Sequence, residues 1–294
     1  MRISLKVDVE DSSGFREGLP AILGLLEQYQ LKATFFFSTG YDNTGLRIRN
    51  LFQPRILSRQ LPIVQKTYGL LLPPVSLSKK FRHLMQECAA AGHDIGLKGF
   101  DSVTWQSQAI NAGEGWVRSQ LQWAIENFET VFGKKPSLSS VPANVVNVFQ
   151  LKQLDEYGFD AAFDTRGKVP YYPDYQDYQG STLQIPVTLP SIEALILQPE
   201  VTMDNVHEYL FVESQKQLPY GHVYEVRAAY EGRQWLPVLE KMIVMWRSSQ
   251  WEFMTASELL DQLSGQQLNR HHIGWDQYKP DYHFRATQSL PIDN

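Results

Sequence analysis

The stretch GHDIGLKGFDSVTW, residues 92–105, indicates how the middle of the chain folds. A helical pattern over Leu77–Ala91 ends at Gly92, a residue type that often follows the last turn of a helix. Asp94–Leu97 then predicts a short strand, and Lys98 follows this strand directly. The stretch therefore predicts a helix-to-strand connection whose strand ends in polar, chemically active side chains.

The same alternation of helices and strands continues on both sides of this stretch. Before it, strands are predicted at 2–9 and 32–38, with a helix at 15–29 between them. After it, helices are predicted at 115–132, 146–157, 235–247 and 256–263, and strands at 159–164, 183–189, 223–228 and 252–254. Such alternation is typical of βαβ units around a parallel sheet, and it favours a distorted (β/α) barrel.

Length and composition limit the kind of protein. The chain has 294 residues, of which 43% are hydrophobic and 20% charged, as in ordinary soluble globular proteins. It has no apolar stretch of membrane-spanning length and begins without a signal-peptide pattern, so we expect a cytoplasmic location. We expect one domain over residues 1–264 and an irregular polar tail over 265–294, which contains His271 and His272.

Residues 43–86 are predicted to form a basic insertion in this domain. The stretch contains no Asp or Glu, and its basic residues are Arg47, Arg49, Arg55, Arg59, Lys66, Lys79, Lys80 and Arg82. Apolar residues alternate with them. Such a segment can lie peripherally on an anionic inner-membrane surface, where each basic residue contributes about 1 kcal/mol to the free energy of binding. Prolines interrupt any long amphipathic helix, so packing of the insertion on its own barrel is an equal alternative.

Functional side chains of a (β/α) barrel gather at the C-terminal ends of the strands. The candidates at these ends are Asp8, Glu10, Asp11, Lys98, Asp101, Ser102, Asp164, Arg166 and Arg227. The sequence has neither a glycine-rich phosphate loop nor a Cys-x-x-Cys pair, and the single Cys88 is expected to be a buried helix residue. The net charge of −5 argues against a nucleic-acid partner.

Seven motifs carry a resemblance to a known family. They are KVDVE (6–10), FREGLP (15–20), FFFSTGYDN (35–43), GHDIG (92–96), DTRG (164–167), QIPVTLP (184–190) and SELL (257–260). In this order they resemble the polysaccharide deacetylase family, and most of all the deformylases that act on undecaprenyl-phosphate-linked 4-deoxy-4-formamido-arabinose in lipid A modification. The resemblance implies an α/β fold, a distorted (β/α) barrel of the polysaccharide deacetylase type.

The resemblance also implies a metal-dependent amide hydrolase. A divalent metal, usually zinc, is held by one carboxylate and two histidines, polarises the amide and lowers the pKa of its bound water. Asp8 matches the catalytic base, and either Glu10 or Asp11 matches the carboxylate that binds the metal. Lys98 and Ser102 stand at the two histidine positions.

Two further positions of the family pattern differ in this chain. The arginine that orients the base is expected within residues 144–147, which here read NVVN, and the histidine that protonates the leaving amine aligns with Arg227. Arginine keeps its proton, with a pKa above about 12, and a lysine ammonium has no lone pair for a metal. We therefore predict that the zinc site of the family is lost and that the chain uses no cofactor.

Carboxylates left in a pocket without a metal would repel one another. We therefore predict that Lys98 lies within hydrogen-bonding distance of Asp8, Glu10 or Asp11, in a salt-bridge network that replaces the metal. The alternative is that these charged groups are solvated at an open rim.

Two functions remain open from the sequence. In the first, the chain is catalytically inactive and binds a lipid-linked or free sugar, or a protein partner, through a pocket that includes Asp101, Asp164 and Arg166. In the second, it hydrolyses the C–N bond of a formamido or acetamido sugar without a metal, with Asp8 as base and Lys98 or Arg227 stabilising the oxyanion. The aromatic group Tyr171, Tyr172, Tyr175 and Tyr178 is either a sugar-stacking surface or part of a proline-rich loop.

Overall fold

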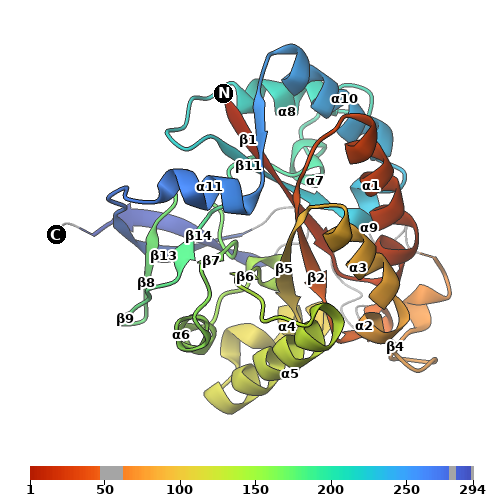
Figure 1. The fold of residues 1–294 in the computed structure, drawn as a ribbon, viewed down its shortest axis with the longest axis vertical. Helices are drawn as coiled ribbons and strands as arrows, with labels where there is room; N and C mark the ends of the chain where they lie inside the picture. Colours follow the sequence, from red (N-terminus) through yellow and green to blue (C-terminus); the bar gives the residue numbers. More distant parts are fainter. Residues whose placement is uncertain (47–61, 278–282, 293–294) are drawn as a thin grey trace.

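A computed structural model describes residues 1–46, 62–277 and 283–292, and its centre is one curled sheet of eight parallel strands (Figure 1). The strands are β1 (Arg2–Val9), β2 (Thr34–Ser38), β5 (Asp94–Gly99), β6 (Leu138–Ser139), β7 (Ala161–Ala162), β10 (Leu183–Gln184), β11 (His222–Arg227) and β12 (Glu252–Met254). Their order is β10-β7-β6-β5-β2-β1-β11, and β12 also pairs with β1. The predicted distorted (β/α) barrel is confirmed, as a curled half-barrel.

The two ends of the sheet approach each other. Beyond β10, the backbone N–H of Thr188 donates to the carbonyl oxygen of Val223 in β11 at 3.0 Å. In the middle of the sheet, β5 packs closely on β2, because a Cβ atom at Gly96 would lie 2.5 Å from the ring of Phe36. This contact explains why the strand of the GHDIG motif carries a glycine at its centre.

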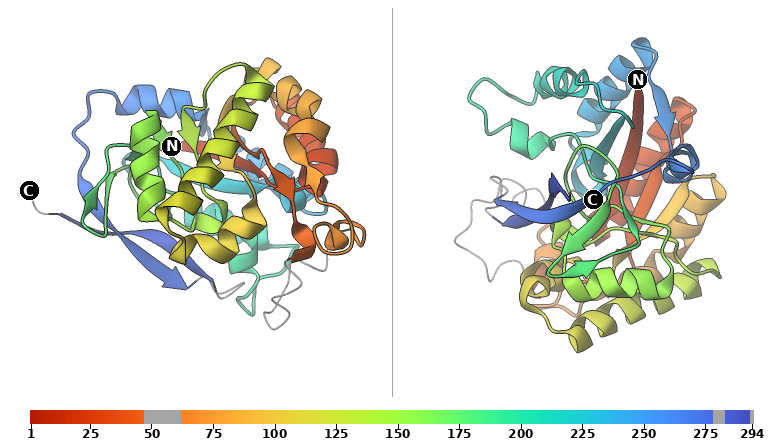
Figure 2. Two further views of the ribbon diagram at one scale, coloured as in Figure 1. Left: turned by 90° about the horizontal axis from the view of Figure 1, so that it is seen from below. Right: turned by 90° about the vertical axis from the view of Figure 1, so that its left-hand side faces the viewer.

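Helices pack around the outside of the curled sheet (Figures 1 and 2). They are α1 (Leu19–Gln28), α2 (Leu77–Lys80), α3 (Arg82–Ala90), α4 (Ser102–Gln108), α5 (Glu114–Phe132), α6 (Val148–Tyr157), α7 (Ile192–Leu195), α8 (Val206–Ser214), α9 (Ala228–Glu231), α10 (Leu236–Ser248) and α11 (Ala256–Leu263). A π-helix over Gly14–Gly18 precedes α1, and the helix predicted over 77–91 is divided at Phe81. No helix in the described ranges is both long and apolar enough to cross a membrane.

Strand β1 explains how charged groups come to lie inside the half-barrel. Side chains alternate between the two faces of a strand. Ile3, Leu5, Val7 and Val9 join the main hydrophobic core, which also contains residues of the outer helices. Lys6 and Asp8 lie on the opposite face and are buried as well. The alternation therefore directs these ionisable side chains into the interior of the curled sheet.

The prediction of an irregular tail over 265–294 is wrong. Arg270–Gln277 and Phe284–Pro291 are the antiparallel strands β13 and β14, which belong to a second, four-stranded sheet with β8 (Tyr172–Tyr175) and β9 (Tyr178–Gln179). The polar composition of this segment gave no strand signal. Its few buried residues, such as Ile273 and Ala286, pack against a part of the chain about a hundred residues earlier in the sequence.

The aromatic group of residues 171–178 belongs to this second sheet. Tyr171 is fully buried, and its hydroxyl lies 3.0 Å from that of Thr165. The hydroxyl of Tyr175 accepts the indole N–H of Trp275 in β13, and Tyr178 donates to Asp155. Tyr175 therefore joins β8 to β13, and Tyr178 joins β9 to α6, so these residues do not form a loose proline-rich loop.

The predicted basic insertion is described in part. Its residues Arg47, Arg49, Arg55 and Arg59 lie outside the described residues. In the remainder, β3 (Tyr41–Asp42) pairs antiparallel with β4 (Val75–Ser76), so both ends of the insertion are held beside the C-terminal end of β2.

Candidate functional site

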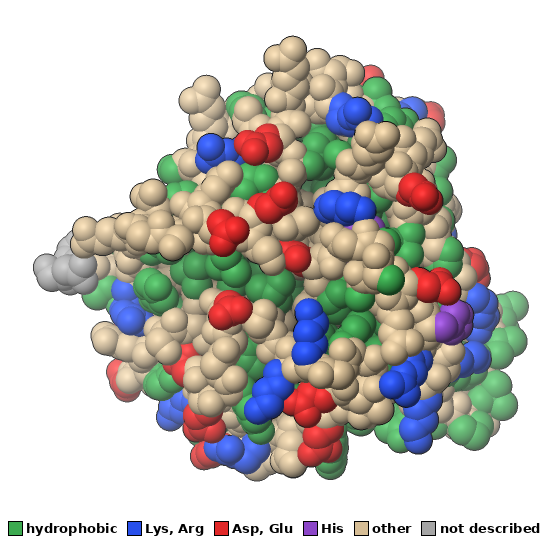
Figure 3. Space-filling model, in the orientation of Figure 1, with side chains coloured by type: hydrophobic (Ala, Val, Ile, Leu, Met, Phe, Trp, Pro, Cys, Tyr) green, Lys and Arg blue, Asp and Glu red, His purple; other side chains and the backbone are tan. Residues whose placement is uncertain are grey.

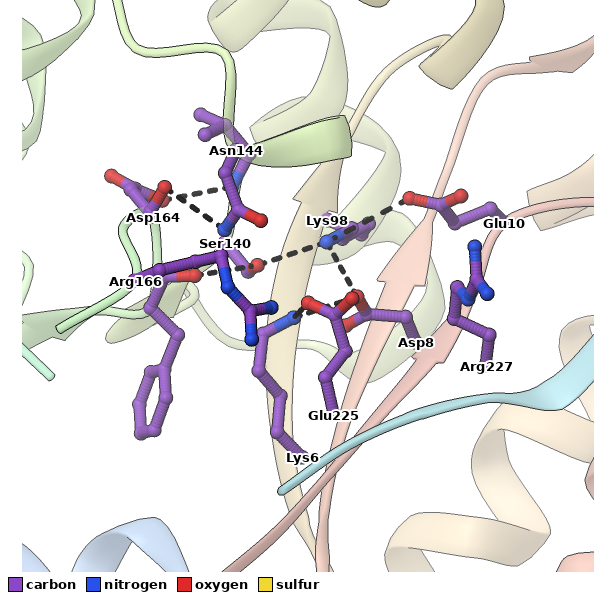
Figure 4. Close-up of polar contacts among 12 residues, drawn as sticks. Lys6, Asp8, Glu10, Lys98, Ser140, Asn144, Asp164, Arg166, Glu225 and Arg227 are labelled. Atoms are coloured by element: carbon purple, nitrogen blue, oxygen red, sulfur yellow. Dashed lines mark hydrogen bonds and ion pairs between the residues drawn. The ribbon is translucent and has the colours of Figure 1, made fainter. Parts of the chain in front are cut away.

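Lys98 is the centre of a buried polar network at the C-terminal end of β5 (Figure 4). Its Nζ atom lies 2.6 Å from Oδ2 of Asp8, 3.0 Å from Oγ of Ser140 and 3.7 Å from Oε1 of Glu10. The Lys98 side chain is only 2% exposed. The predicted ion pair between Lys98 and a carboxylate of β1 is confirmed, and the alternative of an open, solvated rim is wrong for Lys98.

A second lysine, which the sequence interpretation missed, completes the network. Nζ of Lys6 lies 2.6 Å from Oδ2 of Asp8 and 2.8 Å from Oε2 of Glu225. Strands β1 and β11 pair with Lys6 opposite Glu225 and Asp8 opposite Arg227. A sequence pattern could have revealed this pair. Residues two apart in a strand point to the same face, so Lys6 shares a face with Asp8, and Glu225 shares one with Arg227.

Lys98 and Glu225 are stabilised as ions by their partners in this network, whereas burial raises the pKa of Asp8 despite Lys6 and Lys98. Burial disfavours the ammonium form of Lys98, but the carboxylates of Asp8, Glu10 and Glu225 outweigh it and raise the pKa of Lys98 above its ordinary value. Burial would raise the pKa of Glu225, but Lys6 and Lys98 outweigh it and hold that pKa below its usual range. Lys98 therefore stays a cation at neutral pH.

The structure separates the roles of Glu10 and Asp11. Glu10 points toward Lys98 and is the more accessible of the two, with its side chain 21% exposed. Asp11 is buried, and its Oδ1 atom accepts hydrogen bonds from the backbone of Ser13 and Gly14 at the start of the π-helix. Glu10 is therefore the carboxylate that faces Lys98, whereas Asp11 caps a helix.

Ser102 and Asp101 are occupied by local contacts. The hydroxyl of Ser102 lies 2.8 Å from that of Ser38 in β2. The carboxylate of Asp101 caps α4 by accepting the backbone N–H groups of Val103 and Thr104, and it also accepts the side-chain amide of Asn43. Neither side chain contacts Lys98 directly. Asp101 and Ser102 therefore form the rim of the candidate site, which neighbours the Lys98 network but is separate from it.

Asp164 and Asn144 form the other wall of the site. Asp164 is fully buried; its Oδ1 accepts the backbone N–H of Val141, and its Oδ2 accepts the side-chain amide of Gln150. Asn144, in the segment where the family's base-orienting arginine is expected, donates its amide to the carbonyl of Asp164. The guanidinium of Arg166 donates a hydrogen bond to the backbone carbonyl of Leu189.

Two buried acceptor atoms of this wall and of β1 have no hydrogen-bond partner among the described residues. They are Oδ1 of Asn144 and Oδ1 of Asp8. Buried acceptors without a donor are costly, and a ligand or water that donates to them removes the cost. Oδ1 of Asn144 and Oδ1 of Asp8 are therefore unpaired acceptors within the described part of the chain.

Arg227 is engaged by acidic residues of α7 and α9. Its guanidinium forms an ion pair with the fully buried Glu193, it lies 4.9 Å from the ring centre of Tyr230, and its backbone N–H donates to Glu231 at 3.1 Å. Burial raises the pKa of Glu231 to about 7, despite the nearby Arg227. The sequence interpretation missed Glu193 and Glu231, because no motif links their helices to the strand end of Arg227.

The residues that the sequence resemblance assigns to the metal do not suit a divalent cation. Glu10 is an anionic ligand, but Lys98 supplies a positive charge without a lone pair, and Ser102 is a neutral hydroxyl that is paired with Ser38. Within the ranges that the structure describes, no group of three His, Cys, Asp or Glu side chains is arranged to hold a metal.

Comparison with curated proteins gives relatives over most of the chain. The probable 4-deoxy-4-formamido-L-arabinose-phosphoundecaprenol deformylase ArnD of Shewanella sediminis (strain HAW-EB3) is 28% identical over 269 residues, which are 88% of this chain and 86% of that protein. The protein of the same description from Wigglesworthia glossinidia brevipalpis is 26% identical over 78% of this chain and 82% of its own length.

Solved structures share the fold at lower identity. Puue allantoinase superposes with a TM-score of 0.63 at 16% identity, covering 90% of both chains. BA3943 from Bacillus anthracis, described as a CE4 family pseudoenzyme, superposes with a TM-score of 0.53 at 14% identity, covering 92% of this chain and 69% of its own. These likenesses concern the fold.

A family model describes the N-terminal part of the chain directly. It is the polysaccharide deacetylase model, and it matches residues 3–162, the part that contains Asp8, Glu10, Lys98 and Ser102. The curled parallel sheet agrees with this match. The chain therefore belongs to the polysaccharide deacetylase family.

Proposed function

We propose that this chain is a polysaccharide-deacetylase-family protein that binds an amide-bearing sugar without hydrolysing it through a metal. The observation that carries the proposal is the position of Lys98, whose ammonium lies 2.6 Å from Asp8 at one of the family's histidine positions. A buried cation there repels a divalent metal and occupies the carboxylate at the position of the family's base.

The unpaired acceptors support a binding role. Oδ1 of Asp8 and Oδ1 of Asn144 can accept hydrogen bonds from sugar hydroxyls or from the N–H of a formamido or acetamido group. The homology to ArnD deformylases supports a 4-amido-4-deoxy-arabinose as the ligand class, and a lipid-linked form of it is the natural first choice.

A solved structure with this fold is described as a protein without enzymatic activity, which supports the proposal. BA3943 is described as a CE4 family pseudoenzyme, and a mutant of it, with a TM-score of 0.54 to this chain, as one with restored enzymatic activity. Metal-independent hydrolysis by this chain is less well supported, because Lys98, a candidate oxyanion donor, already donates to Asp8 and Ser140.

The test combines metal content, ligand binding and turnover on the untagged full-length protein. Metal is measured by plasma mass spectrometry after incubation with excess zinc and desalting. Binding of the methyl glycosides of 4-formamido- and 4-acetamido-4-deoxy-L-arabinose is measured by calorimetry, and release of formate or acetate is followed on the same samples.

We expect no stoichiometric zinc, measurable glycoside binding and no released acid. Asn144→Leu removes an acceptor and should weaken binding about tenfold, whereas the exposed control Glu114→Gln should not change it. Stoichiometric zinc together with acid release would refute the proposal, and so would the absence of glycoside binding by a folded protein.

A further inference from the structure

An exposed apolar tip lies in the insertion between β3 and β4. We define it as Ile63, Val64, Leu70, Leu71 and Leu72. All five side chains are exposed, Ile63 by 82% and Leu71 by 78%, and the exposed Pro73 and Pro74 continue the run. Consecutive exposed apolar residues are uncommon on soluble proteins and mark interaction surfaces.

The tip is a hydrogen-bonded turn. The carbonyl oxygen of Thr67 accepts the backbone N–H groups of Leu70, Leu71 and Leu72 at 3.1, 2.9 and 3.0 Å. Gly69 has a φ of +76°, which glycine adopts without strain, and Gln65 is buried below the turn. The turn therefore holds the leucines in an outward position instead of folding them onto the barrel.

The tip is joined to the rim of the candidate site. The backbone N–H of Gly45 donates to Tyr68 at 2.9 Å, and the neighbouring Asn43 donates its side-chain amide to Asp101 at 2.5 Å. Asp101 directly precedes Ser102, one of the family's metal-ligand positions. The tip and the site therefore lie at the same edge of the sheet, where β1, β2 and β5 end (Figure 1).

Cations accompany the apolar tip. Lys79 and Lys80 are exposed on α2, directly after β4, whereas Arg82 at the start of α3 donates to the carbonyl oxygen of Thr130 in α5 at 2.6 Å. From Asn43 to Gln86 the sequence contains no Asp or Glu. Figure 3 shows hydrophobic side chains at the lower right edge of the molecule with Lys and Arg side chains beside them. Exposed apolar groups flanked by cations are complementary to an anionic bilayer, whose headgroups carry phosphates above an apolar layer.

We propose that this tip docks the protein on an anionic membrane, with the leucines in the headgroup boundary and Lys79 and Lys80 against lipid phosphates. The biological role of this docking rests on the proposed function, because docking places the rim of the sugar site at the membrane surface. It makes a lipid-linked sugar the ligand class of the site.

The experiment measures docking without any sugar. The full-length protein is sedimented with vesicles of phosphatidylcholine alone, or of equal parts of phosphatidylcholine and phosphatidylglycerol. We expect binding to the anionic vesicles that weakens with added salt, and little binding to the neutral ones. The triple variant Leu70→Ser, Leu71→Ser and Leu72→Ser should bind the anionic vesicles about tenfold more weakly.

Matched variants separate the tip from general effects. Lys79→Glu with Lys80→Glu should also weaken binding about tenfold, whereas the exposed pair Lys134→Glu with Lys135→Glu should change it little. Val212→Ser with Leu290→Ser removes exposed apolar groups elsewhere and should also leave binding unchanged. Thermal melting of each variant checks that it is folded.

Three results would overturn docking on a membrane. They are equal binding to neutral and anionic vesicles, wild-type binding by the triple serine variant, and a tip-dependent dimer in sedimentation velocity that becomes monomeric in that variant. Vesicle binding without glycoside binding would refute the proposed sugar-binding function and leave docking standing, so the two failures are distinguishable.

Discussion

Nζ of Lys98 lies 2.6 Å from Oδ2 of Asp8, and each side chain is only 2% exposed. Lys6 reaches the same oxygen from within β1, also at 2.6 Å. The carboxylate of Asp8 is thus held between two ammonium groups. The arrangement neutralises buried charge with side chains alone, which is the role that a cation would otherwise take in a pocket of carboxylates.

Lys98→Met is expected to destabilise the protein by about 3 kcal/mol, because it removes one partner of a buried ion pair. Lys6 remains beside Asp8 and limits the loss. Urea unfolding measures the effect, with the exposed Lys134→Met as the control that should stay within about 0.5 kcal/mol. The double variant Asp8→Asn with Lys98→Met should lose less than the sum of the single losses. A strictly additive pair would contradict the ion-pair account.

Lys98→His together with Ser102→His is expected to create a site for one zinc ion, because it adds two imidazole ligands to Glu10. Metal content after desalting measures the gain. In this background Glu10→Gln should abolish zinc binding, whereas Asp11→Asn should retain it, since Asp11 caps the π-helix. Zinc that depends on Asp11 and not on Glu10 would show that the two carboxylates are assigned the wrong way round.

Acid should destabilise the fold through His93. Burial, followed by the nearby Lys32, lowers the pKa of His93 from 6.5 to about 4, and its neutral Nδ1 accepts the backbone N–H of Ala33 at 3.2 Å. The unfolded chain therefore binds a proton more readily than the folded one. The stability that this group contributes is complete above about pH 6.5 and is lost as the pH falls toward 4, by up to about 3 kcal/mol.

His93→Asn keeps an acceptor for Ala33 but cannot be protonated in this range. Unfolding free energies at pH 7, 6, 5 and 4 should therefore fall less steeply in this variant than in the wild type. Equal slopes for the two proteins would show that His93 does not contribute to the acid sensitivity.

Ile273→Ala is expected to cost about 2 kcal/mol, because Ile273 in β13 is only 7% exposed and packs in a hydrophobic cluster with Tyr171. The control is Leu290→Ala in β14, which is 74% exposed and should change stability by less than about 0.5 kcal/mol. Chemical unfolding of both variants gives the comparison. If Ile273→Ala were as neutral as its control, the second sheet would not contribute to the stability of the barrel.

Several features followed from the sequence because they depend on local patterns. Alternating strands and helices predicted the barrel, and the position of Lys98 after Asp94–Leu97 placed its ammonium at the C-terminal end of a strand. The spacing of two residues also placed Asp8 on an inward face. These predictions needed only periodicity and the rule that parallel strands end at one edge.

Only the tertiary structure decided which charged side chains pair, and which of Glu10 and Asp11 faces Lys98. Glu225 reaches Lys6, and Glu193 reaches Arg227, across strand pairs and helix packing that no local pattern encodes. Asp11 turned out to be a helix cap, and the polar residues after 264 became strands because β8 offers them an edge. The physical reason is the same in each case: a charge, a cap or an edge strand acquires its role from a partner distant in the sequence, and the fold brings the two together.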